Sequence, residues 1–176
     1  MKHHPQNNGH NVTLAGENFA WKLKVATEAD VDPAVKALSD HMNDRQRAVF
    51  RDKLQRYVRK SDRELIVAVR GGQTLGLVCV IDQAQFPPSF TEQQASHLRN
   101  FASGTQLLVH PFLRRRGIGG SLLTQAEAWA RTRGLAGFWI ITHRMADWYE
   151  TNFGYQQIAR IELKKEAKAV MAKKFD

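Results

Sequence analysis

The sequence has a single cysteine, Cys79, and it lacks any apolar run of about 20 residues, the length that crosses a membrane. One thiol excludes an intrachain disulfide and suits a reducing compartment. Cys79 lies within the apolar residues 77–81, which favours a buried, inert thiol over a nucleophile. The first ten residues also lack the apolar core of a signal peptide. We therefore expect a cytoplasmic protein.

Acidic residues are scarce as well. The 176 residues include 17 Asp and Glu against 26 Lys and Arg, which gives a net charge of +9. Such an excess favours an anionic partner, nucleic acid included. The histidines are scattered and none pairs with cysteine or carboxylate at ligand spacing, so we expect no metal. We predict a flexible arm at residues 1–18, one domain at 19–165 and a basic tail at 166–176. The C-terminal lysines could contact nucleic acid, but charged tails are more often solvated. These lysines are Lys164, Lys165, Lys168, Lys173 and Lys174.

A strand, a turn and a helix are predicted in residues 107–133. Three apolar residues run into His110-Pro111, and a strand ends there because proline cannot donate to a ladder. Apolar residues then recur at helical spacing over about 119–133. The glycine turn between them, residues 114–120, holds three arginines and three glycines. Glycines let a backbone approach a ligand closely, and a helix N-terminus attracts phosphate, so this stretch predicts a pyrophosphate site.

Two better-known phosphate motifs do not fit the glycine turn. The P-loop requires a Lys-Ser/Thr pair after its last glycine, whereas Gly120 is followed by Ser121 and Leu122. The dinucleotide fingerprint requires a third glycine at the place that Leu122 holds. A basic triplet also occurs as a solvated turn or a nucleic-acid patch. Because this triplet runs straight into the glycines, we favour phosphate binding.

Hydrophobic patterns predict the remaining elements. About twenty residues, 83–103, separate a hairpin from the central strand, and we expect them to form a lid over the substrate, with a packing accessory as the alternative. The other predictions are, in order, a strand at 21–25, a helix starting at Asp32-Pro33 with Val35, Leu38 and Met42 on one face, a helix at 44–60, strands at 64–70 and 74–81, a helix opened by Ser89 and Glu92 that carries Phe90, Leu98 and Phe101, a strand at 137–142, a helix at 144–151 and a strand at 156–163.

This order of elements, together with the glycine turn, resembles the GNAT superfamily of N-acetyltransferases over about residues 21–163. The acetyl-CoA motif of that family, Gln/Arg-x-x-Gly-x-Gly/Ala, is matched by Arg114, Gly117 and Gly119, and Val109 and Pro111 match the Val-x-Pro ahead of it. The resemblance implies an α/β fold. Its mixed, mostly antiparallel central sheet would be splayed at the acetyl-CoA site and flanked by helices.

A second motif of the family, an Ala, a Tyr and then Gly-Phe, is similar to Ala146, Tyr149 and Gly154-Tyr155. The spacing differs, because the family places its Tyr four residues after the Ala and four before the Gly, and here these separations are three and five. His143 stands where an Asn is common. The resemblance implies that the Tyr149 hydroxyl protonates the departing thiolate.

The resemblance also implies how acetyl-CoA is held. Its pantetheine arm pairs with strand backbone, the N–H near Val109 faces the oxyanion, and its pyrophosphate rests on the glycine turn. The implied cofactor-binding residues are Leu107, Leu108, Val109, Arg114, Arg115, Arg116, Gly117, Ile118, Gly119, Gly120 and Ser121.

A base, or a water chain, must take the proton of the attacking amine. Residues 105–108 contain no carboxylate, which leaves Asp82, Glu92, His110 and His143 as candidates. The predicted catalytic residues are Tyr149 and Asp82.

The implied activity is transfer of the acetyl group of acetyl-CoA to a primary amine of a small molecule or peptide. Two alternatives stay open. One is acetylation of an RNA-linked amine, which the positive charge would suit, and the other is a non-catalytic module that binds acyl-CoA or nucleic acid. No membrane partner is expected, and a homodimer is compatible with the sequence.

Overall fold

The computed structural model describes residues 20–82 and 86–176, so the arm predicted at 1–18 lies outside the described residues. The backbone clusters into two compact units. Unit 1 contains the described residues up to Cys79 together with Gln106–Gln125, and unit 2 contains Val80–Thr105 and Ala126–Asp176.

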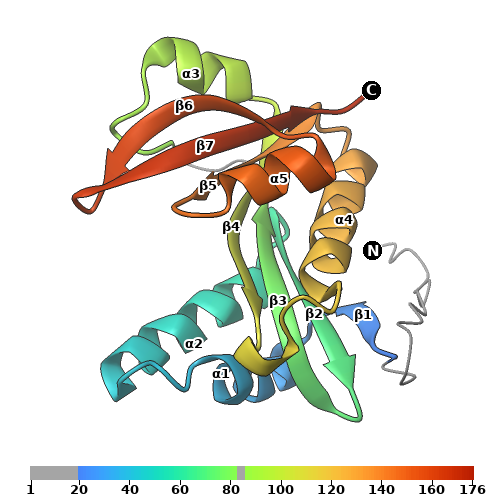
Figure 1. Cartoon of the computed structure of the whole chain (residues 1–176). Coiled ribbons are helices and arrows are strands. Elements are labelled where there is room, and N and C mark those ends of the chain that lie inside the picture. The colour runs from blue at the N-terminus through green and yellow to red at the C-terminus, as the bar shows by residue number, and fades with distance from the viewer. Residues whose placement is uncertain (1–19, 83–85) are drawn as a thin grey trace. The chain divides into compact units, whose positions relative to one another are not determined.

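Unit 1 holds the N-terminal helices and the strands nearest to them in sequence (Figure 1). Strand β1 pairs antiparallel with β2, from Lys22 opposite Val69 to Val25 opposite Ile66. Gly71 and Gly72 join β2 to β3 with φ of +54° and +81°, as a tight hairpin turn requires. The elements lying wholly or partly in this unit are β1 (Lys22–Val25), η1 (Glu28–Asp30), α1 (Val31–Leu38), α2 (Asp44–Arg59), β2 (Arg63–Arg70), β3 (Gln73–Ile81), β4 (Phe101–Val109), η2 (Pro111–Leu113) and α4 (Ile118–Thr132).

Helix α1 begins earlier than predicted. The carboxylate of Asp30 accepts hydrogen bonds from the backbone N–H and the hydroxyl of Thr27, at 2.9 and 3.0 Å, and so opens η1, which runs directly into α1. Pro33 is therefore the third residue of the helix and not the first, a position where the missing N–H costs no intrahelical bond. The helix ends at Leu38, so Met42 is not on its face as predicted.

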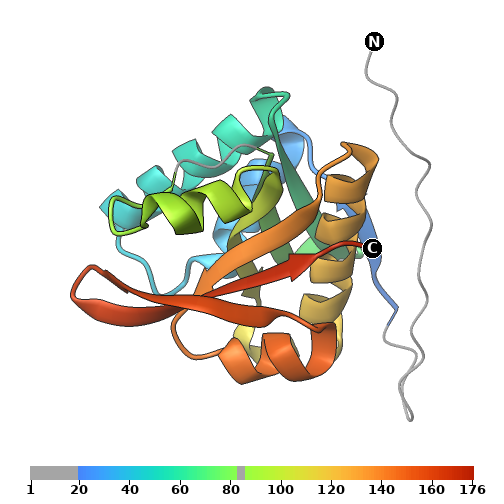
Figure 2. The same cartoon turned by 90° about the horizontal axis from the view of Figure 1, so that it is seen from above.

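Unit 2 is built on β5 (Gly137–Thr142). This strand pairs in parallel with β4 from Phe101 opposite Gly137 to Gly104 opposite Ile140, and antiparallel with β7 (Glu166–Lys174). Strand β7 pairs in turn with β6 (Gln156–Leu163), so it lies between β5 and β6, as both views show (Figure 2). The strand order of the seven-stranded sheet is β1-β2-β3-β4-β5-β7-β6. The predicted α/β class, with a mostly antiparallel sheet flanked by helices, is confirmed.

Strand β7 corrects the prediction for residues 166–176. The sequence favoured a solvated basic tail, but Val170 and Met171 are fully buried and Lys173 donates to the buried carboxylate of Glu127 at 2.8 Å. Alanine, lysine and glutamate are depleted in strands, which concealed this one. The turn before it, Lys164-Lys165, has positive φ at both residues without the glycine or asparagine that usually marks such a turn.

The insertion before β4 packs into the core of unit 2. Helix α3 (Glu92–Leu98) is capped by Thr91 and Gln94, not by Ser89 and Glu92 as predicted, because the N–H of Phe90 closes a turn on the carbonyl of Pro87. Leu98 is fully buried beside Phe101, which opens β4 and does not belong to the helix. Phe86 and Phe90 each lie 5.6 Å from the ring of Trp139. The described part of the insertion therefore acts as the packing accessory, the alternative to the lid.

Removing residues 166–176 should abolish cooperative unfolding of unit 2, because the truncation takes the central partner from both β5 and β6 and exposes their apolar faces. Circular dichroism melting checks this expectation, with removal of Asp176 alone as the control. A truncated protein that melts like the full chain would contradict the role given to β7.

Replacing the turn Lys164-Lys165 by Asn-Gly should raise the free energy of unfolding by about 1 kcal/mol, because two side chains no longer hold the left-handed backbone region. Urea denaturation measures the change. The Lys164→Gln/Lys165→Gln variant removes the same two charges but keeps the strain, so it should show no gain. An equal gain in both variants would assign the effect to charge.

Candidate active site

The glycine turn leads from β4 into α4 through two residues with left-handed backbone. The N–H of His110 donates to the carbonyl of Leu75 at 2.9 Å and fixes the end of β4. The chain then passes η2, and φ is +60° at Arg115 and +81° at Gly117. Ser121 donates to the carbonyl of Gly117 at 3.0 Å, which closes the first turn of α4. The predicted order of strand, turn and helix is confirmed, with the helix at Ile118–Thr132.

The first turn of α4 presents backbone donors. In an α-helix the first N–H groups have no acceptor within the helix. Since the first intrahelical bond is donated by Ser121, these groups include the amides of Ile118, Gly119 and Gly120. Two of the three residues carry no side chain, so a ligand can approach the backbone closely. Amides and helix dipole together favour an anion, and phosphate in particular.

Packing against β3 holds this turn in place. A Cβ built at Gly76 would lie 2.7 Å from the carbonyl oxygen of Leu108 and within 3.3 Å of the side chains of Ile118 and Leu122. Glycine at position 76 therefore leaves room for the Leu108 carbonyl, with which a Cβ would collide, and for Ile118 and Leu122, which a Cβ would crowd. Ile118 and Leu122 are buried as a result, and the donors of the first turn belong to a rigid element.

Three exposed arginines, Arg114, Arg115 and Arg116, precede the helix. A guanidinium offers donors in a fork that matches phosphate oxygens. The sequence-predicted residues 107–109 and 114–121 are thus brought together within unit 1 as one continuous strand end, basic turn and helix N-terminus.

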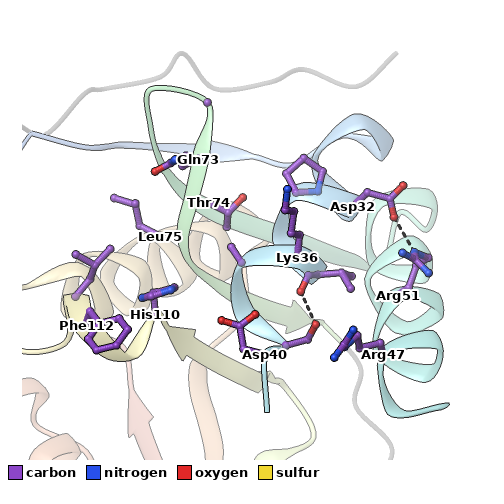
Figure 3. A pocket seen from close by; sticks show the side chains of 16 residues that line it. Asp32, Lys36, Asp40, Arg47, Arg51, Gln73, Thr74, Leu75, His110 and Phe112 are labelled. Carbon is purple, nitrogen blue, oxygen red and sulfur yellow. Dashed lines mark hydrogen bonds and ion pairs between the residues drawn. The ribbon is translucent and has the colours of Figure 1, made fainter. Parts of the chain in front are cut away.

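A hollow of about 1390 Å³ lies beside His110 and is lined by residues of α1, β3 and η2. The side chains of His110 and Phe112 lie next to each other there, 5.6 Å apart between ring centres, with Lys36 and Asp40 among the other lining residues (Figure 3). Phe112 is 87% exposed. The Nδ1 atom of His110 is buried and has no hydrogen-bond partner among residues 20–82 and 86–176.

Tyr149, the predicted acid, lies in unit 2 on α5 (Ala146–Phe153), a helix that starts and ends two residues later than predicted. Its ring packs edge-on against Trp148 and Tyr155, with centres 4.8 and 5.6 Å apart. The side chain is buried, and burial raises the pKa of Tyr149 to about 12. The phenol therefore stays protonated at neutral pH, which a proton donor requires.

The four base candidates differ in what they contact. Asp82 accepts a hydrogen bond from Arg133 at 3.0 Å, while its other carboxylate oxygen is buried without a partner in the described part of the chain. Glu92 pairs with Arg99 on the surface. His143 lies 4.0 Å from the carboxylate of Glu166. Arginine side chains therefore hold one carboxylate oxygen of Asp82 and one of Glu92, so those two oxygens are already engaged within the protein.

Sequence reasoning missed two residues of a second cavity in unit 1. Gln106 of β4 and Lys53 of α2 line a pocket of about 430 Å³. Gln106 follows Ser103, Gly104 and Thr105, so no isolated polar residue in β4 marked a site, and nothing in the pattern of α2 singled out Lys53.

Metal-binding groups and membrane-spanning helices were considered for the described residues. In residues 20–82 and 86–176, no group of three histidine, cysteine or acidic side chains is placed to hold a metal ion. Within the same ranges, no helix combines the length and the apolar character needed to cross a membrane.

Comparison with known proteins identifies the family. The sequence profile of the acetyltransferase (GNAT) family matches residues 28–155, which is most of the chain and includes the glycine turn. The chain therefore belongs to the GNAT family of acetyltransferases. The comparison with curated proteins found no match.

Solved structures share the fold at low identity. The PaiA N-acetyltransferase of Thermoplasma acidophilum, solved with coenzyme A, is 15% identical with a TM-score of 0.66, and the alignment covers 89% of this chain and 100% of that one. An aminoglycoside 6'-acetyltransferase type Ii is 15% identical with a TM-score of 0.68, over 86% and 96%. An acetyltransferase of the GNAT family from Streptococcus pneumoniae is 16% identical with a TM-score of 0.63, over 88% and 99%.

Proposed function

We propose that this protein transfers the acetyl group of acetyl-CoA to the nitrogen of a primary amine. The observation that carries the proposal is the N-terminus of α4, where free backbone amides, two helical glycines and three arginines meet. This set fits a pyrophosphate, the charged centre of coenzyme A. The PaiA N-acetyltransferase, a structural neighbour, was solved with coenzyme A, which supports the same assignment.

The residues that would hold acetyl-CoA have separate tasks. The amides of Ile118, Gly119 and Gly120 bind pyrophosphate oxygens, and the arginines supply charge. The backbone of residues 107–109 runs along the pantetheine arm. The N–H near Val109 is the proposed donor to the oxyanion that forms as the amine attacks.

Acetyl-CoA supplies an activated thioester carbonyl. A C–N bond forms as the C–S bond breaks, the amine loses one proton, and the thiolate gains one. The hydroxyl of Tyr149 is the proposed donor to the thiolate. His110 and Asp82 are the proposed base candidates, since each has one buried side-chain atom without a hydrogen-bond partner in the described part of the chain; the other carboxylate oxygen of Asp82 is paired with Arg133.

Gly119→Glu should abolish acetyl-CoA binding, because it puts a side chain and a negative charge beside the amides of the first helical turn. Isothermal titration calorimetry measures binding, and release of free thiol measures transfer to a panel of amines, peptide N-termini and aminoglycosides. Thr124→Glu is the matched control, since it adds the same charge at an exposed position further along α4.

Unchanged affinity in Gly119→Glu would show that the glycine turn is not the cosubstrate site. Acetyl-CoA binding by the parent without thiol release for any amine would instead favour the non-catalytic module. Salt-sensitive retention on RNA would favour the RNA-linked acceptor.

Tyr149→Phe should lower kcat by about 100-fold and leave the KM for acetyl-CoA unchanged, since only the hydroxyl is lost. The pKa of Tyr149 is raised to about 12 by burial, so the parent should lose no activity through its ionisation below about pH 11. Steady-state kinetics over pH, in both proteins, tests this. An unchanged kcat with rate-limiting chemistry would remove Tyr149 from the mechanism.

A further inference from the structure

The second cavity of unit 1, here called the α2 pocket, is lined by residues of α2, of the segment before it and of β4. Its volume is about 430 Å³, within the range of pockets that bind small molecules. The lining residues used below are His41, Met42, Arg45, Val49, Lys53 and Gln106.

Gln106 gives the pocket an unused hydrogen-bond acceptor. Its side-chain oxygen is buried and accepts no hydrogen bond from any residue of the described ranges 20–82 and 86–176. A buried acceptor left unpaired costs about 1–3 kcal/mol. Because Gln106 lines the pocket, a turn of its side-chain amide would bring this oxygen to an N–H group of a bound ligand and remove the cost, and a primary amine carries such groups.

Five of the six cations of α2 fall into two stripes. Arg47, Arg51 and Arg59 follow one another at multiples of four residues, and each has an acidic partner, respectively Asp44, Asp32 and Glu28. This stripe is therefore neutralised within the protein.

The other stripe faces the α2 pocket. Arg45, Val49 and Lys53 are spaced four residues apart, so they share one side of the helix. In the described part of the chain, neither cation has an acidic partner, and no acidic residue lines the pocket with them. Burial lowers the pKa of Lys53, and a bound anion would favour its charged form again. His41 adds a third basic side chain.

Apolar side chains also line the pocket. Val49 is 61% exposed, which is unusual for a residue of its type, and Met42 lines the pocket beside it. A ligand that satisfies all three features carries an amine, an anionic group and an aliphatic part.

From this arrangement we infer that the α2 pocket binds the acceptor, and that the acceptor is a small primary amine bearing a carboxylate or a phosphate. This assignment rests on the proposed acetyl transfer and names its substrate class. Gln106 receives the amine, and Arg45 and Lys53 bind the anion. A polyamine or a polycationic aminoglycoside would place positive charge against these cations and is disfavoured.

The test compares amines that differ only in the anionic group: lysine against cadaverine, and phosphoethanolamine against ethanolamine. In one of the two pairs, thiol release should show a kcat/KM at least tenfold higher for the anionic amine than for the neutral one. A difference of this size is expected of a single charge-assisted contact. A response to lysine indicates a carboxylate, and a response to phosphoethanolamine indicates a phosphate. Lys53→Gln and Arg45→Gln should each reduce this preference severalfold through KM. Lys60→Gln, at an exposed cation just after α2 that does not line the pocket, should leave it unchanged.

Gln106→Leu supplies a second test, because it removes the unpaired oxygen. It should raise the amine KM at least tenfold while thermal stability is kept or increased. The inference would be overturned if kcat/KM were equal within both pairs of amines, or if the neutral amines were preferred. It would also be overturned if Lys53→Gln changed kcat/KM equally for the anionic and the neutral amine of a pair.

Binding can be followed without turnover through the side-chain amide resonances of Gln106 in nitrogen-15 NMR spectra of the full chain. Shifts on adding lysine or phosphoethanolamine, but not on adding the neutral member, support the pocket even if no amine is acetylated. Binding without acetylation would contradict the proposed acetyl transfer but support the α2 pocket as a binding site. Absence of shifts with either anionic amine overturns the site itself.

Discussion

The close packing of α4 on β3 at Gly76 is the constraint on which the cosubstrate site depends. A side chain at Gly76 would meet the carbonyl of Leu108 at 2.7 Å and press on Ile118 and Leu122. Its absence lets the first turn of α4 rest on the sheet, which buries both apolar residues. The amides proposed to bind pyrophosphate are therefore fixed by the core of unit 1, and preorganised donors lose little entropy when an anion binds.

The sequence sufficed for this part of the protein because its signals are local. An apolar strand end, a proline, glycines and a helical repeat all fall between Leu107 and Thr132, and the structure follows them closely. Strand β7 could not be predicted in the same way. Its burial comes from pairing with β5 and β6, whereas its own lysines and alanines favour solvent or helix.

The residues of the candidate site also differ in whether the sequence predicts them. The residues of the glycine turn were predictable, since each belongs to one continuous motif. Gln106 and Lys53 were not, because their shared pocket arises from packing of α2 near β4, and neither residue type marks a site by itself. The N-terminal caps of the η1–α1 segment and of α3 were predicted at the wrong residues for a related reason. The observed caps, Thr27 with Asp30 and Thr91 with Gln94, lie close to other residues that are equally plausible caps in the sequence.

The positive charge, too, is less available to a partner than the composition suggested. Lys173 binds the carboxylate of Glu127, which also accepts the hydroxyl of Tyr155 at 2.9 Å. One cation of the expected basic tail therefore belongs to a buried network, and the case for nucleic acid is correspondingly weaker. What remains distinctive is the segment 106–110. Within the described ranges 20–82 and 86–176, Gln106 Oε1 and His110 Nδ1 are buried without a hydrogen-bond partner, and each of these two residues lines its own cavity. Unpaired buried polar atoms cost stability, and a ligand that hydrogen-bonds to one of them offsets that cost.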